Sequence, residues 1–183
     1  MKIINTPIVD LFAVETKSSK DVRGAFGRFF CVSELATIIG NRCIVQINHS
    51  HTATVGAVRG MHFQYPPNAE MKLVRCLKGK VWDVAVDLRP TSLNYKRWHA
   101  QELSANNAYM MVIPEGFAHG FQVLEADSEL LYLHTAFYNP NCESGLRHDD
   151  PCLAIDWPLK VTDISTRDTN HAYIDSNFNG ITL

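Results

Sequence analysis

The chain alternates between short runs in which every second residue is apolar and clusters of residues that favour turns. Such period-two runs are typical of β-strands that turn one face toward a core. Turn residues separate them, as at Lys78-Gly79 and Pro114-Glu115-Gly116. Strands are predicted at residues 43–48, 71–77, 80–89, 109–114, 121–125 and 129–138. Strands this short and this frequent predict an all-β sandwich or barrel.

In two of these runs, the alternation shows which side chains share a face of the strand. In the run 80–89, Trp82 and three aliphatic residues share one face, whereas Asp83 and Asp87 project from the other. We expect the first face to be core and the second to be wet or functional. In the run 71–77, Lys72 projects to one side and Arg75 to the other, so the two cations are separated.

The only helices expected are short. Residues 33–39 read as a helix with Ser33 as its capping residue, and residues 103–107 read as a turn that Ser104 could cap.

Length and charge restrict the kind of protein. A chain of 183 residues with 46% hydrophobic and 20% charged residues can bury a proper core, and it predicts a single domain over 1–183. The net charge of −2 gives no overall basic field for nucleic acid or for a membrane surface. An anionic ligand must therefore meet a local cluster of cations.

The cysteines indicate a reducing compartment. They are odd in number, scattered and never in a CxxC pair: Cys31, Cys43, Cys76, Cys142 and Cys152. Cys76 and Cys142 have no activating neighbours and are not expected to be nucleophiles. Polar residues interrupt the apolar run at the amino terminus, so neither a signal peptide nor a spanning helix is predicted. A cytoplasmic location is expected.

Two motifs are similar to those of cupins. The first contains His62, Gln64 and Glu70, and the second is the Pro-x-Gly-x-x-His segment that ends at His119. In a metal cupin these four positions would bind iron, manganese or zinc. An amide is a weak ligand for a transition metal, so Gln64 makes this a poor set. No metal or other cofactor is expected.

Other polar residues give weaker signals. His49 and His51 form a His-x-His pair without a following glutamate, and they fit a polar loop after a strand. Asp83 and Asp87 could be paired acids, but aspartates on strands are more often solvated or salt-bridged, and that is the reading we favour. His62, with Lys72 nearby in the sequence, favours a functional pocket, although a structural histidine remains an alternative.

Ten blocks in order along the chain carry a more specific signal. They are DVRGAF (21–26), QINHS (46–50), RGMHFQ (59–64), KLVRC (72–76), DVAVDLRPTS (83–92), LSANN (103–107), IPEGFAHGF (113–121), LLYLHTAFYNP (131–140), DDPCLAIDWP (149–158) and STRD (165–168). From Asp21 to Asp168 the chain resembles the dTDP-4-dehydrorhamnose 3,5-epimerase family. The resemblance implies a metal-free, cupin-type jelly-roll barrel with a few short helices. It also implies a homodimer that exchanges amino-terminal strands, and a nucleotide-linked 4-keto-6-deoxyhexose as substrate.

The resemblance also implies roles for individual residues. The family's catalytic base falls on His62, its proton donor on Tyr132, the carboxylate that orients the histidine on Asp168, and the lysine beside the keto oxygen on Lys72. Its substrate contacts fall on Arg23, Phe26, Gln46, Asn48, Arg59, His119, Glu143 and Arg167. Arg23 and Phe26 would reach into the pocket of the neighbouring subunit.

Three positions depart from the family pattern. Arg28 stands where relatives usually have a glutamate, which puts the nucleotide contact in question. Leu133 stands where a lysine is more usual after the tyrosine. The segment HDDP, which begins at His148, stands where relatives have a block that contains tryptophan. These changes leave the acid–base set whole, but they bear on which sugar, base or carbon is handled.

The residue types suit the chemistry. A ketone at C4 acidifies the hydrogens at C3 and C5, and inversion needs a base on one face of the ring and an acid on the other. An imidazole with a pKa of about 6.5 can accept a proton at pH 7, whereas a phenol with a pKa of about 10 can donate one. Arg23, Arg59 and Arg167 would grip a diphosphate through planar guanidinium groups.

Three functions therefore compete. The first is an epimerase of a nucleotide-activated 4-keto-deoxysugar. The second is a metal-dependent cupin isomerase or oxygenase, and the third is a non-catalytic cupin that binds sugar nucleotides. The combined presence of His62, Lys72, Tyr132 and Asp168 argues against the third, because binding alone requires no acid–base pair.

Overall fold

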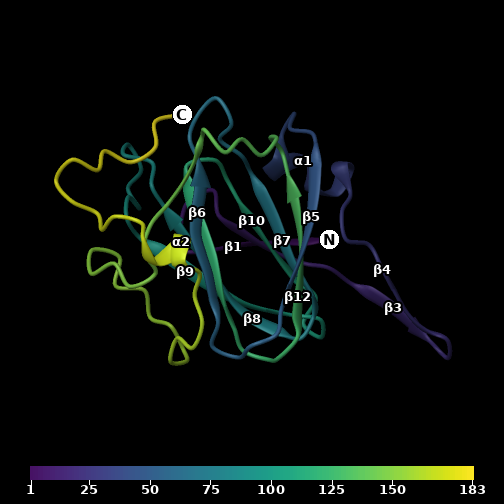
Figure 1. The fold of residues 1–183 in the computed structure, drawn as a ribbon. Coiled ribbons are helices and arrows are strands. Elements are labelled where there is room, and N and C mark those ends of the chain that lie inside the picture. Colours follow the sequence, from purple (N-terminus) through teal and green to yellow (C-terminus); the bar gives the residue numbers. More distant parts are fainter.

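A computed structural model describes residues 1–183 and contains two short helices among many strands (Figure 1). The strands are β1 (Lys2–Asn5), β2 (Phe12–Glu15), β3 (Ser18–Asp21), β4 (Gly24–Gly27), β5 (Gln46–Thr52), β6 (Val58–Gln64), β7 (Lys72–Lys78), β8 (Lys80–Asp87), β9 (Trp98–Ser104), β10 (Tyr109–Ile113), β11 (Phe117–Val123), β12 (Ser128–His134) and β13 (Glu143–Gly145). The helices are α1 (Val32–Ile39) and α2 (Thr166–Thr169). Neither helix is long and apolar enough to cross a membrane.

Two antiparallel sheets face each other. One has six strands in the order β1-β2-β10-β7-β12-β5, and the other has five in the order β13-β6-β11-β8-β9. Along the chain, β6, β7 and β8 alternate between the sheets, and β10, β11 and β12 do the same. Such crossing connections make a jelly roll, and Figure 1 shows the two sheets enclosing an interior. The predicted all-β, cupin-type jelly-roll fold is confirmed.

Alternation along β7 sorts its side chains as the sequence predicts. Val74 and Cys76 point into the interior cluster between the sheets. Leu73 lies on the opposite face, in a cluster with Leu35 and Ile39 of α1. The helix therefore covers the outer face of the six-stranded sheet.

The two faces of β8 pack on different sides of the sheet. The face predicted to be core, with Val84 and Val86, packs outward beneath the carboxyl-terminal segment, which contributes Ile155 and Ile174. The face predicted to be wet or functional points into the barrel, where Asp83 is fully buried and pairs with His119. It is therefore not wet, and the functional alternative remains. Both faces of the five-stranded sheet are covered, because residues 146–181 cross its outer side and the six-stranded sheet closes the inner one.

Several local predictions are corrected. The His-x-His pair does not lie in a loop, because β5 extends to Thr52; His49 contacts Glu129 and His51 contacts Asp127 at 3.1 Å each. Ser33 does not cap α1, which begins after Cys31 and has no side-chain cap.

Two other local predictions are confirmed. The Ser104 hydroxyl accepts a hydrogen bond from the Asn107 backbone N–H at 3.0 Å, which makes the expected capped turn. Asp87 forms a salt bridge, in which its Oδ2 lies 2.8 Å from Arg89 Nη2.

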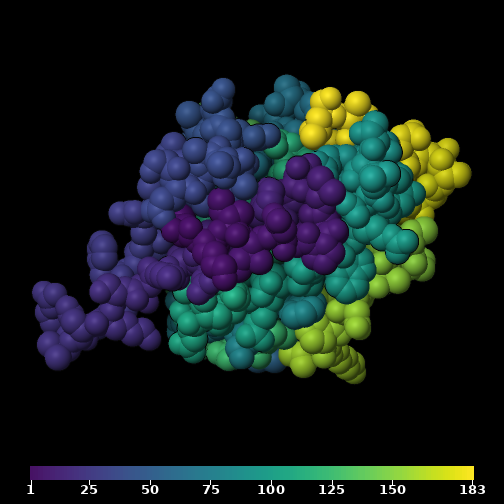
Figure 2. Space-filling view, turned by 180° about the vertical axis from the view of Figure 1, so that it is seen from behind, coloured from purple at the N-terminus to yellow at the C-terminus, as the bar shows by residue number.

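The β3–β4 hairpin forms an arm that stands clear of the rest of the molecule, as Figures 1 and 2 show from two sides. It carries apolar side chains into solvent: Phe26 is 82% exposed and Val22 is wholly exposed. An isolated two-stranded hairpin is marginally stable on its own. The arm therefore lacks the packing partner that its side chains require.

Gly60 sets the spacing between β6 and β11. Its φ is +119°, and an added Cβ would lie 2.5 Å from Gly120 Cα and 2.7 Å from the His119 carbonyl oxygen. We expect Gly60→Ala to lower the melting temperature by at least about 3 °C, because the disfavoured conformation alone costs roughly 1–3 kcal/mol. Thermal denaturation followed by circular dichroism measures the change.

Gly27→Ala is the matched control, since its added Cβ would meet nothing closer than 3.5 Å. An unchanged melting temperature for Gly60→Ala would show that the strands tolerate a wider spacing.

Candidate active site

A cavity of about 680 Å³ opens between the two sheets, within the usual size of small-molecule sites. Every predicted site residue lines it except Arg23 and Phe26. The lining members are His62, Tyr132, Asp168, Lys72, Gln46, Asn48, Arg59, His119, Glu143 and Arg167. Arg23 and Phe26 lie on the protruding arm, where Arg23 pairs with Asp21 at 2.6 Å. Within one chain, the expected cluster of three arginines is therefore reduced to Arg59 and Arg167.

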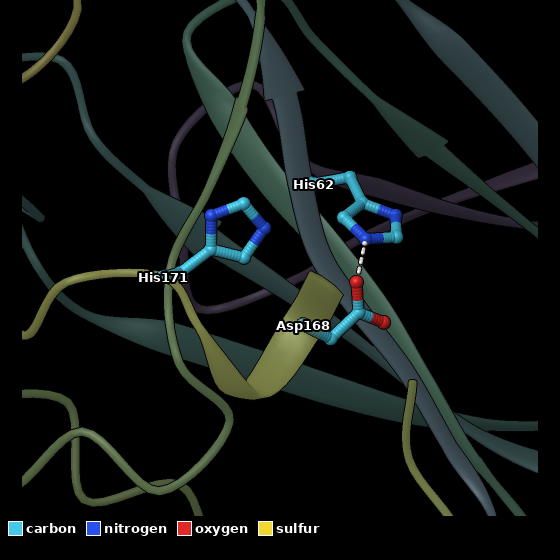
Figure 3. Close-up of side chains that lie close together, drawn as sticks. All are labelled: His62, Asp168 and His171. Atoms are coloured by element: carbon cyan, nitrogen blue, oxygen red, sulfur yellow. Dashed lines mark hydrogen bonds and ion pairs between the residues drawn. The ribbon is translucent and has the colours of Figure 1, made fainter. Parts of the chain in front are cut away.

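His62 and Asp168 form a hydrogen-bonded pair at one wall of the cavity (Figure 3). His62 Nε2 lies 2.8 Å from Asp168 Oδ1, although the two residues are 106 positions apart. The Gly60 backbone N–H donates to the second carboxylate oxygen at 3.1 Å. Asp168 sits in α2, whose first turn is capped by the Ser165 hydroxyl, and its side chain is almost fully buried.

The charge of this pair determines which ring nitrogen is free. Burial alone would raise the pKa of Asp168, but the hydrogen bond and charge of His62 and the Gly60 N–H lower it by more, so the net shift is downward. Asp168 is therefore a carboxylate. Arg167 Nη2 also lies 2.9 Å from His62 Nε2, but of these two neighbours only the carboxylate can accept the Nε2–H of His62. The neutral imidazole then has its lone pair on Nδ1, where it can accept a proton.

Tyr132 reaches the same cavity from the facing sheet. It projects from β12, and its hydroxyl lies 3.0 Å from the hydroxyl of Ser50 on β5. Burial raises the pKa of Tyr132, so the phenol stays protonated at neutral pH. A proton acceptor on one sheet and a proton donor on the other thus border a single cavity. Ser50 was not predicted as a site residue, although it lies two positions after Asn48 on β5 and therefore shares its face.

Lys72 is held by a buried carboxylate. Its Nζ lies 3.1 Å from Glu70 Oε1, and His134 Nδ1 lies 2.7 Å from Glu70 Oε2. Burial would raise the pKa of Glu70, but the hydrogen bond from His134 and the charge of Lys72 outweigh it, so the net shift is downward. The ring of His134 stacks on Tyr132 with centroids 6.1 Å apart. His134 was missed, although the period of two places it on the same face as Tyr132.

The three cupin-type metal positions other than His62 have donor atoms bound to other protein groups. His119 Nε2 lies 2.8 Å from Asp83 Oδ1, and both side chains are buried. The Gln64 amide donates to the Asn68 carbonyl oxygen at 3.0 Å. Glu70 binds Lys72 and His134, as described. Asp83 is thus the partner of a cavity histidine, a role that its strand pattern alone does not reveal.

The rim of the cavity carries further charges. Arg59 donates from Nε to the Thr52 hydroxyl at 2.9 Å. Arg167 reaches Glu143 at 3.2 Å, and the same Glu143 accepts from the Tyr138 hydroxyl at 2.8 Å. Both arginines leave N–H groups free for an anion.

Two of the departures from the family pattern lie away from the cavity. Arg28 pairs with Glu34 of α1. Leu133 is buried under α1, on the outer face of the six-stranded sheet.

A two-sheet jelly roll in which one cavity is lined by a histidine–carboxylate pair and a partly buried tyrosine defines a cupin-type barrel. The family model described as dTDP-4-dehydrorhamnose 3,5-epimerase matches residues 5–176. The dTDP-4-dehydrorhamnose 3,5-epimerase of Shigella flexneri is 39% identical over 97% of this chain and 99% of its own length. That of Escherichia coli K12 is 42% identical over 86% of this chain and 85% of its own.

Solved structures agree with the sequence relatives. The dTDP-6-deoxy-D-glucose-3,5-epimerase of Legionella pneumophila, in complex with dTDP-4-keto-L-rhamnose, superimposes with a TM-score of 0.91 at 37% identity. The match covers 100% of this chain and 98% of that one. The chain belongs to the dTDP-4-dehydrorhamnose 3,5-epimerase family, and it is an isomerase.

The Asp168 carboxylate should make the free energy of unfolding depend on pH in the acidic range. Its pKa in the folded state lies below the unfolded value of about 3.9, so its contribution is fully present above that pH and is lost as pH falls through the folded pKa. We expect Asp168→Asn to lower the free energy of unfolding at pH 7 by roughly 1–3 kcal/mol. The difference from wild type should shrink between about pH 4 and pH 2.

Urea denaturation at several pH values measures this difference. Asp156→Asn is the control, because Asp156 is exposed and makes no ion pair. A difference between Asp168→Asn and wild type that stays constant from pH 7 to pH 2 would contradict the depressed pKa.

Proposed function

We propose that this protein inverts C3, C5 or both centres of a dTDP-linked 4-keto-6-deoxyhexose. The observation that carries the proposal is the placement of His62 and Tyr132 on opposite sheets around one cavity. Membership of the epimerase family supports the same reaction and the same class of substrate.

The proposed reaction passes through an enolate. His62 Nδ1 takes the proton from the carbon beside the ketone, and the electron pair of that C–H bond moves toward the C4 oxygen. The imidazolium that forms is stabilised by Asp168, which already accepts its Nε2–H. Tyr132 then gives its hydroxyl proton to the carbon from the opposite face, which inverts the centre. Solvent returns a proton to the phenolate and removes one from the imidazolium.

Lys72 has the proposed task of stabilising the C4 oxygen. Its ammonium group lies in the cavity wall, and Glu70 fixes its position at 3.1 Å. A positioned donor of this kind typically contributes on the order of 10²–10³ in rate.

The nucleotide diphosphate has candidate partners at the rim. Arg59 and Arg167 line the cavity and leave N–H groups free. We propose that Arg23 and Phe26 join the site from the partner subunit of a homodimer in which the β3–β4 arms are exchanged. The exposure of Val22 and Phe26 supports the exchange, because burying them against a second copy removes apolar surface from water.

The pathway and location are part of the same proposal. The substrate belongs to dTDP-rhamnose biosynthesis, which serves cell-surface polysaccharides. All five cysteines are free thiols, which fits a reducing cytoplasm.

The base assignment is tested by hydrogen exchange. We expect His62→Ala to abolish exchange of the C3 hydrogen of dTDP-4-keto-6-deoxyglucose with deuterium oxide, measured by proton NMR, because no other group takes the proton. His51→Ala is the matched control, since His51 pairs with Asp127 outside the cavity lining. Wild-type exchange in His62→Ala would refute the base. Tight binding by the wild type without any exchange would favour a binding protein instead.

The acid assignment is tested separately. Tyr132→Phe keeps the base but removes the donor on the opposite face, so we expect exchange at the carbon to continue while inversion slows by about 10²–10⁴. The ratio of deuterium incorporation to epimer formation in one NMR time course reports this split. An equal fall of both rates would contradict the assigned role of Tyr132.

A further inference from the structure

His171 lies beside the His62–Asp168 pair and has no part in the proposed reaction. It follows α2 directly, three positions after Asp168. One ligand atom from each of His62, Asp168 and His171 can be chosen so that all three lie within 4.8 Å of one another. Figure 3 shows a ring nitrogen of His171 directed toward the pair. Two imidazoles and one carboxylate therefore converge.

The His171 side chain has an unused donor atom. Its Nε2 is buried and has no hydrogen-bond partner. Buried polar atoms in proteins usually have a hydrogen-bond partner. A buried nitrogen without a partner, next to two other possible metal ligands, therefore indicates that a bound ligand is missing.

The neighbouring strand leaves room for this ring. Gly145 of β13 is the cross-strand partner of His62. A Cβ at Gly145 would lie 2.4 Å from His171 Nε2 and 2.8 Å from the Met61 carbonyl oxygen. Any larger residue would push His171 away from the pair. The absence of a side chain at Gly145 is thus what lets the second imidazole approach.

The donor set selects the class of ion. Two imidazole nitrogens with one carboxylate oxygen are typical of zinc and similar transition-metal ions, whereas Mg²⁺ and Ca²⁺ prefer oxygen ligands alone. Three protein ligands also leave a fourth position open. His62 Nε2 and Asp168 Oδ1 are already 2.8 Å apart. To bind the same ion, His171 must move closer than the present 4.8 Å spread of the three ligand atoms.

One cation now occupies part of this space. Arg167 Nη2 lies 2.9 Å from His62 Nε2. The Arg167 side chain is about half exposed, and it also contacts Asp168 at 3.4 Å and Glu143 at 3.2 Å. A metal ion at this site must displace Arg167 from His62 and Asp168, which leaves Glu143 as its carboxylate partner.

We propose that His62, Asp168 and His171 form a three-ligand site for a divalent ion of the zinc class, and that occupying it switches the enzyme off. The metal bonds to the lone pair of His62 Nε2, so the single proton of the neutral ring resides on Nδ1. A ring protonated at Nδ1 accepts nothing from the substrate carbon, and Asp168 is drawn to the metal. The inhibition rests on the proposed epimerase reaction, whereas the binding does not.

Binding is tested first and without substrate. The full chain, freed of metal with EDTA, is titrated with ZnCl₂ by isothermal titration calorimetry at pH 7.5. We expect one zinc per chain, and at least tenfold weaker binding by His171→Ala. His51→Ala is the control and should bind as wild type does, because His51 pairs with Asp127 elsewhere. His171→Asn is the second variant if His171→Ala does not fold. Equal affinity of wild type and the His171 variants would overturn the site.

Inhibition is tested next by following solvent exchange of the keto-sugar at rising zinc concentration. Wild type should lose exchange and regain it with EDTA, while His171→Ala should keep its basal rate and need at least tenfold more zinc. Stoichiometric zinc bound through His171 with unchanged exchange would overturn the switch. A chain without any exchange would refute the epimerase proposal, and the calorimetry would still decide the metal site.

Discussion

The hydrogen bond between His62 and Asp168 joins parts of the chain that have no local reason to meet. Asp168 is almost fully buried, and a buried carboxylate is tolerated only when hydrogen bonds replace water. His62 takes one oxygen and the Gly60 N–H takes the other. Because His62 and Gly60 both belong to β6, the acid can be satisfied only when α2 is docked against that strand. The docking of α2 and the orientation of the imidazole therefore depend on the same two hydrogen bonds.

The same segment holds the barrel together from outside. Its apolar residues, among them Ile155, Ile174 and Ile181, pack on the outer face of the five-stranded sheet. This packing brings α2 to the cavity and leaves His171 next to the pair. Apolar contacts on one side of the sheet thus set the electrostatics on the other.

Ionic pairs occupy the barrel interior where a metal cupin would hold its ion. Glu70 binds Lys72 and His134, and Asp83 binds His119. Each pair fixes a cation or an imidazole at low exposure, where electrostatic interactions are stronger than in water. A keto-sugar entering this cavity would meet donors that are already in place.

Much of the site was predictable from the sequence. Alternation along β7 separated Lys72 from Arg75, and the family resemblance named His62, Tyr132 and Asp168, which the structure brings to one cavity. Other predictions stayed open or were wrong where a pattern has two physical meanings. The alternation of β8 indicates a strand but does not tell whether its aspartates face water or a barrel interior. The polar residues around His49 and His51 favour a loop by local propensity, but β5 continues through them, because pairing with β12 outweighs that weak propensity.

The sequence by itself determined the strands, the faces of their side chains and the kind of chemistry, because period and residue type are local properties. Only the tertiary structure decided the partners: Asp168 for His62, Glu70 for Lys72 and Asp83 for His119. Such pairs depend on how two sheets and a covering segment pack together. That packing depends on the total apolar surface buried, which no short stretch of sequence contains.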